Sequence, residues 1–428
     1  MLGLAYSQLT TERAAEQLDT QSSTAATSVP EVPRFPLGRP EPPTPEWDSL
    51  DDRCRQAGLA AIRGCMQSFV DYGSIVGLVT LVDHGDSTVQ VDAVGQYVPN
   101  TVFQIMSMTK PFTSVLVMKL IEEGRIPSVE STVASLPGLE TFPYPQVTIR
   151  QLLTHTSGVW PRHELPSGRI DGIAPHLTNW LDRDTTTTSR DKTLEFVASH
   201  YADDDLYPLA STQPVYSNMA FMMLGWIIER MSGRSFEQYM AEQLTGPLGL
   251  EDTFLFPSNA SPEQRARIAD VDRRLPDPPD YNHYDKLRPE WGYPSPEGGL
   301  YSTARDLREF LRLFRHGGQI PGQPRILSEA SVEALMRPDD AVSGIVHQSC
   351  ETARSLGFFV VREPGCLELP GLKPGTVLHN GRFSTLFWYD PQDDEIGIVL
   401  YQVVSRPGPY PSVGEGDAFR QLLARARP

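Results

Sequence analysis

The alternation of apolar and polar positions becomes regular near residue 52, where it predicts a helix followed by a hairpin. Apolar residues recur at helical spacing from Asp52 to Tyr72. Two apolar runs follow at residues 75–83 and 88–95, with the turn sequence H-G-D-S between them. This pattern is typical of two strands joined by a tight turn.

The C-terminal part of the chain also shows strand-like patterns. They occupy residues 356–363, 376–380, 384–390 and 395–403, and an apolar periodic segment at 417–427 predicts a closing helix. Strands near both ends, with mostly helical sequence between them, indicate one antiparallel sheet built from both termini. The predicted fold class is therefore mixed α/β (α+β), an antiparallel sheet flanked by helices with a helical domain beside it.

This pattern also predicts how the chain is divided. Residues 1–46 become rich in Ser, Thr and Pro toward their end and are expected to form a flexible or surface-wrapped extension. Residues 47–428 form the folded part. Its sheet is expected at about 47–105 and 340–428, and its helical part at about 106–339.

Two apolar segments in the middle of the chain predict buried helices, over residues 111–124 and 219–233. Each is apolar on most of its faces, which is typical of helices enclosed in a core, and each ends at a glycine. The residues directly before each helix are the candidates for chemistry.

Ser107 and Lys110 precede the first of these helices. At a spacing of three they lie on one face of a helix that begins at or just before Ser107, and Pro111 fits such a start. The lysine's neighbours in I-M-S-M-T-K-P-F are mostly apolar. Burying an ammonium there is costly, so the neutral amine becomes accessible and can act as a base that activates Ser107.

The same spacing occurs again at Ser189 and Lys192, in polar and charged sequence. We interpret that copy as an ordinary solvated pair, so the motif alone is a weak signal. The apolar setting distinguishes Ser107 from it.

Tyr216 and Asn218 precede the second buried helix, in P-V-Y-S-N-M-A. Residues two apart in an extended segment point the same way, so the phenol and the amide can face one site. Beside a lysine, Tyr216 can relay a proton to or from Ser107. In isolation such a sequence is more typical of a turn that leads into a helix.

Together these motifs resemble the serine β-lactamase and penicillin-binding protein superfamily. The segments V-T-I-R-Q-L-L-T-H-T-S-G-V at 147–159 and S-P-E-G-G-L-Y-S-T-A-R-D-L at 295–307 are similar to its class C β-lactamase-like branch of esterases, D-aminopeptidases and transacylases. The resemblance runs from about residue 48 to the C-terminus. It implies a β-lactamase/transpeptidase-like fold and a serine acyl-enzyme.

A third motif of this superfamily, usually Lys-Thr-Gly, corresponds here to His379, Asn380 and Gly381. The resemblance implies that these residues bind substrate and that the amides of Ser107 and Arg382 form the oxyanion hole. Gly381 is expected to let substrate approach the strand edge. The alternative is that His379 only ends a strand. A mostly neutral histidine suits a β-lactam carboxylate less than lysine does, so weak β-lactamase activity is expected.

Composition and charge exclude some classes of binding partner. The net charge of -17 disfavours nucleic acid and anionic membrane surfaces. No stretch is long enough for a membrane span, and the N-terminus lacks a signal-peptide pattern. The four cysteines have no C-x-x-C spacing, so reduced thiols, no structural zinc and a cytoplasmic location are expected.

Other candidate residues are weaker. His155 is expected to be a structural residue that hydrogen-bonds its own loop. Trp160, Trp226 and Trp291 either shape a dry acceptor pocket, with Trp160 contacting substrate, or are plain core. Motifs of α/β-hydrolases, metalloproteases and nucleotide-binding loops are absent from the sequence, so we expect no metal and no cofactor.

Three functions remain open. In the first, Ser107 attacks a small-molecule ester or amide, Lys110 and Tyr216 share the proton transfers, Asn218 and His379 orient the substrate, and water releases the acid. In the second, an amine or alcohol acceptor takes the acyl group. In the third the protein binds ligands without turnover, which the set of candidate catalytic residues argues against. The donor, the acceptor and the oligomeric state stay open.

Overall fold

The structure, a computed structural model, describes most of the predicted folded part. It describes residues 59–71, 75–86, 88–140, 145–159, 214–270, 295–342, 345–347, 350–363 and 372–403. All of these belong to the unit Thr44–Pro428. The predicted extension 1–46, the predicted C-terminal helix, Trp160, Trp291 and the Ser189–Lys192 pair lie outside the described residues.

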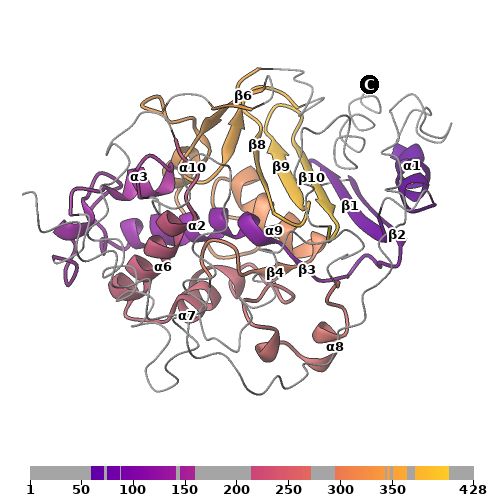
Figure 1. The fold of residues 1–428 in the computed structure, drawn as a ribbon, viewed down its shortest axis with the longest axis horizontal. Helices are drawn as coiled ribbons and strands as arrows, with labels where there is room; N and C mark the ends of the chain where they lie inside the picture. The colour runs from indigo at the N-terminus through magenta and orange to yellow at the C-terminus, as the bar shows by residue number, and fades with distance from the viewer. Residues whose placement is uncertain are drawn as a thin grey trace, which may run out of the picture. The chain divides into compact units, whose positions relative to one another are not determined.

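One antiparallel sheet of eight strands is built from both ends of the described chain, in the order β2-β1-β10-β9-β8-β7-β6-β5. Figure 1 shows the indigo β1 and β2 beside the yellow β10 and β9. The strands are β1 (Gly77–His84), β2 (Thr88–Gly95), β5 (Ile345–His347), β6 (Cys350–Arg354), β7 (Phe359–Val361), β8 (Val377–Asn380), β9 (Leu386–Asp390) and β10 (Glu395–Leu400). The predicted fold class is thereby confirmed.

The central strands are apolar because both faces of the sheet are buried against helices. In β1, Val79 and Leu81 belong to one core cluster, whereas Leu78 and Val82 belong to the other. Successive side chains of a strand point to opposite faces, so a strand covered on both sides carries a continuous apolar run. The sequence pattern does not predict β5 or β6, because both are short and β6 is the mixed run C-E-T-A-R.

Helices supply this cover. Helix α1 (Leu59–Asp71) contributes Met66 and Phe69 to one cluster. Helices α2 (Thr109–Glu122) and α9 (Ala304–Arg315) contribute to the other, where the rings of Phe112 and Phe310 stack at 3.6 Å between centroids. The other α-helices are α3 (Ile149–Leu153), α6 (Asn218–Ser232), α7 (Phe236–Met240), α8 (Pro262–Arg265) and α10 (Glu329–Met336).

Both predicted buried helices are present as α2 and α6. Helix α2 ends shortly before Gly124, whose φ is +69°, and α6 is closed by Gly233 at φ +71°. Glycine adopts this left-handed conformation at helix ends without strain. At the other end of α6, the Ser217 hydroxyl accepts a hydrogen bond from the amide of Ala220 at 3.1 Å, which fixes where the helix begins.

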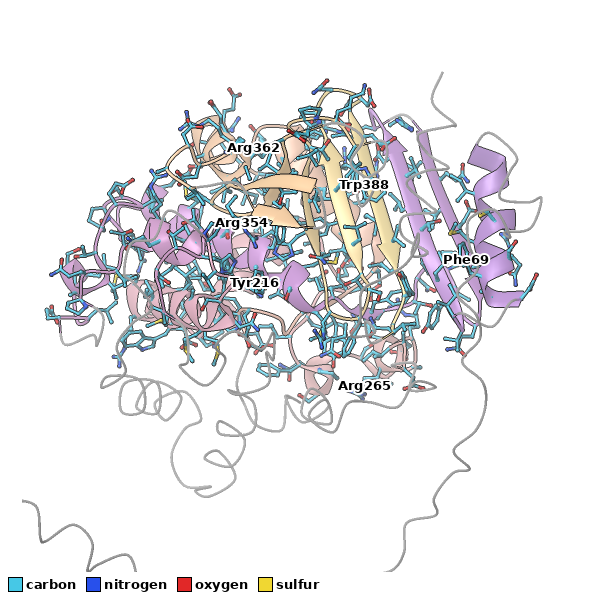
Figure 2. All side chains as sticks on the ribbon, turned by 45° about the horizontal axis from the view of Figure 1, so that its top comes forward. Phe69, Tyr216, Arg265, Arg354, Arg362 and Trp388 are labelled. Atoms are coloured by element: carbon cyan, nitrogen blue, oxygen red, sulfur yellow. The ribbon has the colours of Figure 1, made fainter. Side chains whose placement is uncertain are left out.

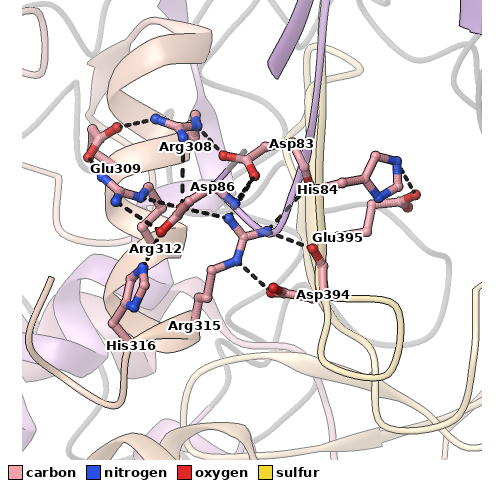
Figure 3. Close-up of polar contacts among 10 residues, drawn as sticks. All are labelled: Asp83, His84, Asp86, Arg308, Glu309, Arg312, Arg315, His316, Asp394 and Glu395. Carbon is pink, nitrogen blue, oxygen red and sulfur yellow. Dashed lines mark hydrogen bonds and ion pairs between the residues drawn. The ribbon is translucent and has the colours of Figure 1, made fainter. Parts of the chain in front are cut away.

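An ion-pair network fastens α9 to two turns at one end of the sheet (Figure 3). Arg315 donates to Asp83 at 2.7 Å, to Asp86 at 2.9 Å and to Asp394 at 2.7 Å, and Arg308 also pairs with Asp83. The Asp83 carboxylate is fully buried. A buried charge is tolerated only when it is paired, so this contact is a strong constraint on the position of α9.

Cys65 on α1 is disulfide-bonded, so the expectation of reduced thiols is wrong for this residue. Pairing depends on distance in the fold, which cysteine spacing does not reveal. Disulfides persist mainly in oxidising compartments, so the cysteines no longer support the predicted cytoplasmic location. Within the described residues, no helix is long and apolar enough to cross a membrane.

Candidate active site

Ser107 lies on a single turn of 3₁₀-helix, Met106–Met108, between the short strand β3 (Phe103–Gln104) and α2. Met106 has a φ of +51°, a strained value for a side chain of this size. The turn is held from both sides. The Thr109 hydroxyl donates to the Met106 carbonyl at 2.7 Å and accepts from the Leu300 amide at 3.1 Å, and the Ile105 amide donates to the Leu300 carbonyl at 2.9 Å. The residues after Gly298 thus fix the Ser107 segment.

The side chain of Lys110 is fully buried and points at Ser107. Its Nζ lies 3.1 Å from Ser107 Oγ, 2.9 Å from Asn218 Oδ1 and 2.8 Å from the carbonyl oxygen of Glu297. A carbonyl oxygen can only accept a hydrogen bond. Asn218 Oδ1 and the Glu297 carbonyl therefore accept N–H groups of Lys110, and the third contact of Nζ is with the Ser107 hydroxyl. This geometry suits a base that activates Ser107.

Tyr216 lies on the other side of Lys110, whose Nζ is 4.7 Å from the centroid of the phenol ring. Among the described residues the Tyr216 hydroxyl has no hydrogen-bond partner. It is therefore not committed to a structural contact there, and a proton relay to substrate needs such a group.

The imidazole of His155 binds the Tyr216 segment rather than its own loop, so the expectation is wrong for the side chain. Its Nδ1 accepts a hydrogen bond from the Ser217 amide at 3.0 Å, and its carbonyl accepts from the Val215 amide at 2.8 Å. Burial, assisted by the charges of Arg354 and Lys110, lowers the pKa of His155 well below its usual value. The imidazole is therefore a neutral acceptor at neutral pH.

His379 on β8 is also buried and neutral. Burial, with the nearby charges of Lys110 and Arg354, lowers its pKa well below the usual value. Its Nδ1 lies 2.9 Å from the carbonyl oxygen of Asn380, which can only accept, so Nδ1 carries the proton and Nε2 keeps a lone pair. The side chain of Asn380 is exposed.

Gly381 is required by the protein's own backbone. A Cβ there would lie 2.3 Å from the carbonyl oxygen of Ile105 and 2.2 Å from Oγ1 of Thr385. The Thr385 hydroxyl also donates to the Ile105 carbonyl, at 3.2 Å. These contacts bring the chain before Arg382 against the chain before Ser107. The oxyanion role of those two amides stays a prediction.

Arg354, at the end of β6, is a site residue that the sequence analysis missed. Its side chain is buried, with Cζ 5.4 Å from the centroid of the Tyr216 ring and 3.5 Å from that of Phe359. Figure 2 shows Arg354 beside Tyr216. Burial lowers the pKa of Arg354 to about 9, so the group stays charged at neutral pH. An arginine in a polar five-residue run carries no sequence signal that separates it from a surface residue.

The fold, with a serine, a lysine and a tyrosine brought together in this way, defines a β-lactamase-like serine enzyme. The chain belongs to the beta-lactamase family, because the profile of that family, described as Beta-lactamase, matches residues 62–425. This confirms the family inferred from the motifs.

Individual relatives cover most of the chain. Protein Rv1367c of Mycobacterium tuberculosis is 28% identical over 369 residues, which span 78% of this chain and 87% of that protein. Among solved structures, "EstCE1, a hydrolase with promiscuous acyltransferase activity" has a TM-score of 0.66 at 21% identity and covers 85% of this chain and 97% of its own. The D-amino acid amidase of Ochrobactrum anthropi has a TM-score of 0.62 at 17% identity, with coverages of 86% and 98%.

Proposed function

We propose that the protein hydrolyses a small-molecule ester or amide through an acyl-enzyme on Ser107. The observation that carries this proposal is the set of contacts of Lys110, whose Nζ is held by Asn218 Oδ1 and the Glu297 carbonyl at 3.1 Å from Ser107 Oγ. Among the described residues, no three His, Cys, Asp or Glu side chains are grouped so that they could hold a metal ion. The proposed acyl transfer to serine does not require a metal ion.

The reaction has two halves. Ser107 Oγ attacks the acyl carbon while its proton passes to Lys110, and collapse of the tetrahedral species expels the alcohol or amine, which takes a proton by way of Lys110 and Tyr216. Water then attacks the acyl-enzyme, its proton passes back to Lys110, and the acid leaves as Ser107 recovers its hydrogen. Asn218 and His379 orient the substrate, and the amides of Ser107 and Arg382 hold the oxyanion.

Transfer of the acyl group to an amine or alcohol is the second candidate. It differs only in the nucleophile of the second half-reaction, and it is supported by the similarity to EstCE1, a hydrolase with promiscuous acyltransferase activity. Trp226 packs against the hydrophobic core. This packing explains its position without a role in an acceptor pocket. Rapid turnover of β-lactams is not part of either candidate, because His379 supplies no positive charge.

Labelling of Ser107 tests the proposal. A fluorophosphonate should modify Ser107, as located by peptide mass spectrometry, and Ser107→Ala should abolish both labelling and hydrolysis of a p-nitrophenyl ester. Ser114→Ala is a matched control, because Ser114 is a buried serine one turn after Lys110 whose hydroxyl donates to the Lys110 carbonyl at 3.2 Å. Ester turnover that survives Ser107→Ala would contradict the assignment.

Competition between acceptors separates the two candidates. With one p-nitrophenyl ester as donor, a series of amines and alcohols is added, and the ratio of acid to amide or new ester is measured by mass spectrometry. Acid as the sole product at every acceptor concentration supports hydrolysis, whereas a transfer product that saturates with acceptor supports the acyltransferase. A chromogenic cephalosporin should be turned over slowly or not at all.

A further inference from the structure

A buried guanidinium that has no counter-ion among the described residues lies next to the candidate catalytic residues. Arg354 is 4% exposed, yet none of the described residues forms an ion pair or hydrogen bond with its guanidinium, and its Nε is a buried donor with no partner. Leaving a buried charge uncompensated costs several kcal/mol. This cost would be offset if a bound ligand paired with the guanidinium.

The orientation of this group leaves its hydrogen-bond donors available. The Cζ of Arg354 lies 3.5 Å from the centroid of the Phe359 ring, so the guanidinium is in close contact with an aromatic ring that cannot neutralise it. The N–H groups of a guanidinium lie in its plane, in a fork that matches the two oxygens of a carboxylate. Contact with the Phe359 ring thus positions the guanidinium and leaves its N–H groups available to an acceptor.

Arg354 lies close to the candidate catalytic residues. The same Tyr216 ring lies 5.4 Å from Arg354 Cζ and 4.7 Å from Lys110 Nζ. The nearby imidazoles, His155 and His379, are both neutral, so neither competes as a cation nor neutralises the arginine. The chain as a whole carries -17, so attraction of an anion to this place has to come from a local cation.

We propose that Arg354 is an anion subsite, and that the ester or amide acylating Ser107 carries a carboxylate that pairs with this guanidinium. This rests on the proposed acyl chemistry and names its substrate class. In the Lys-Thr-Gly motif that the resemblance assigns to β8, the cation stands at the position of His379. Here it is displaced two strands along the sheet, to β6. The subsite therefore differs in place from one suited to β-lactams.

Matched ester pairs test the subsite. The mono-p-nitrophenyl ester of adipic acid is compared with p-nitrophenyl hexanoate, and 4-carboxyphenyl hexanoate with phenyl hexanoate, which places the anion on the acyl side or on the leaving group. Spontaneous hydrolysis of each ester is subtracted. One anionic ester should have a kcat/KM about 10- to 100-fold above its neutral partner, as expected for a charged hydrogen-bonded pair.

Variants then assign this preference to Arg354. Arg354→Met should remove the preference, by lowering kcat/KM for the anionic ester about 10- to 100-fold more than for its neutral partner, and Arg354→Lys should restore part of it. An equal loss for both members of a pair would show that Arg354 acts on Tyr216 instead, and would overturn the subsite. Equal rates for both pairs in the wild-type enzyme would overturn it as well.

A measurement on the wild-type protein covers the case in which the variants do not fold. Free adipate should inhibit hydrolysis of the neutral ester competitively and slow fluorophosphonate labelling of Ser107, whereas hexane-1,6-diol should do neither. No inhibition by adipate, with the neutral ester turned over normally, refutes the subsite while the acyl chemistry stands. Failure of the acyl chemistry itself would appear differently, as absence of turnover and of Ser107 labelling.

Discussion

His155 holds the Tyr216 segment through the hydrogen bond from the Ser217 amide, which we call the His155 clamp. Two substitutions separate the contribution of this acceptor from that of the aromatic ring. His155→Phe keeps an aromatic ring against Tyr216 and Phe221, whose centroids lie 4.5 and 5.1 Å away, but removes the acceptor of the Ser217 amide. His155→Asn keeps an acceptor near the position of Nδ1 and loses the ring. Asparagine also tolerates the φ of +61° at this position.

The magnitudes follow from these contacts. In the Phe variant the buried amide of Ser217 is left unpaired, which costs about 1–3 kcal/mol. Since the lost bond locates Tyr216, kcat/KM for a p-nitrophenyl ester should fall about 10- to 100-fold. The Asn variant loses only aromatic contacts, about 0.5–1.5 kcal/mol, and its activity should stay within about tenfold of wild type.

Urea unfolding gives the stability change, and kcat/KM measured from pH 6 to 9 gives the catalytic one. Because His155 is neutral throughout this range, the Asn variant should keep both limbs of the wild-type pH profile. A Phe variant with full activity beside an impaired Asn variant would refute the clamp. Loss of one limb in the Asn variant would show that His155 titrates as a catalytic base.

Three further predictions concern the scaffold and the motif around Gly381. Arg315→Met leaves a buried carboxylate with one guanidinium fewer, so the free energy of unfolding in urea should fall by about 3–5 kcal/mol, against less than 1 kcal/mol for Arg234→Met in an exposed pair. Burial raises the pKa of Asp306 to about 6, so the folded state binds more protons than the unfolded state between about pH 4 and 6. Relative to Asp306→Asn, the free energy of unfolding of the wild type should fall by about 3 kcal/mol as pH rises through this window; a difference between the two proteins that does not change with pH would contradict the raised pKa. Gly381→Ala should cost about 1–3 kcal/mol and impair ester turnover, whereas Gly298→Ala, with its nearest contact at 3.7 Å, should be neutral in both assays; equal effects of the two substitutions would contradict the close-approach argument.

Local patterns were sufficient to predict α2, α6 and the relation between Ser107 and Lys110. Helical spacing, a terminal glycine and an apolar run are all encoded within a few residues. The order of the motifs along the chain then indicated the family and the sheet shared by both ends. These features could be predicted because each depends on neighbours in sequence or on a pattern shared with relatives.

The features that were missed depend on tertiary contacts. Arg354 gains its significance only because β6 lies two strands from β8, and His155 because its imidazole meets the amide of Ser217. The arginines of α9 resemble those of any solvated helix until Asp83 at the end of β1 and the turn that holds Asp394 are placed against them. The need for Gly381 likewise comes from the Ile105 carbonyl, which is distant in sequence.

The sheet shared by both ends also constrains how the protein is synthesised. Val79 of β1 pairs with Leu400 of β10, so the chain must be synthesised past residue 400 before β1 gains its second neighbour. Until then the hairpin of β1 and β2 exposes two apolar faces and an open edge, which is the condition for aggregation of a nascent chain. Such long-range pairing slows folding. The Thr385 contact with Ile105 is also distant in sequence, so the Ser107 segment receives this support only when the C-terminal strands arrive.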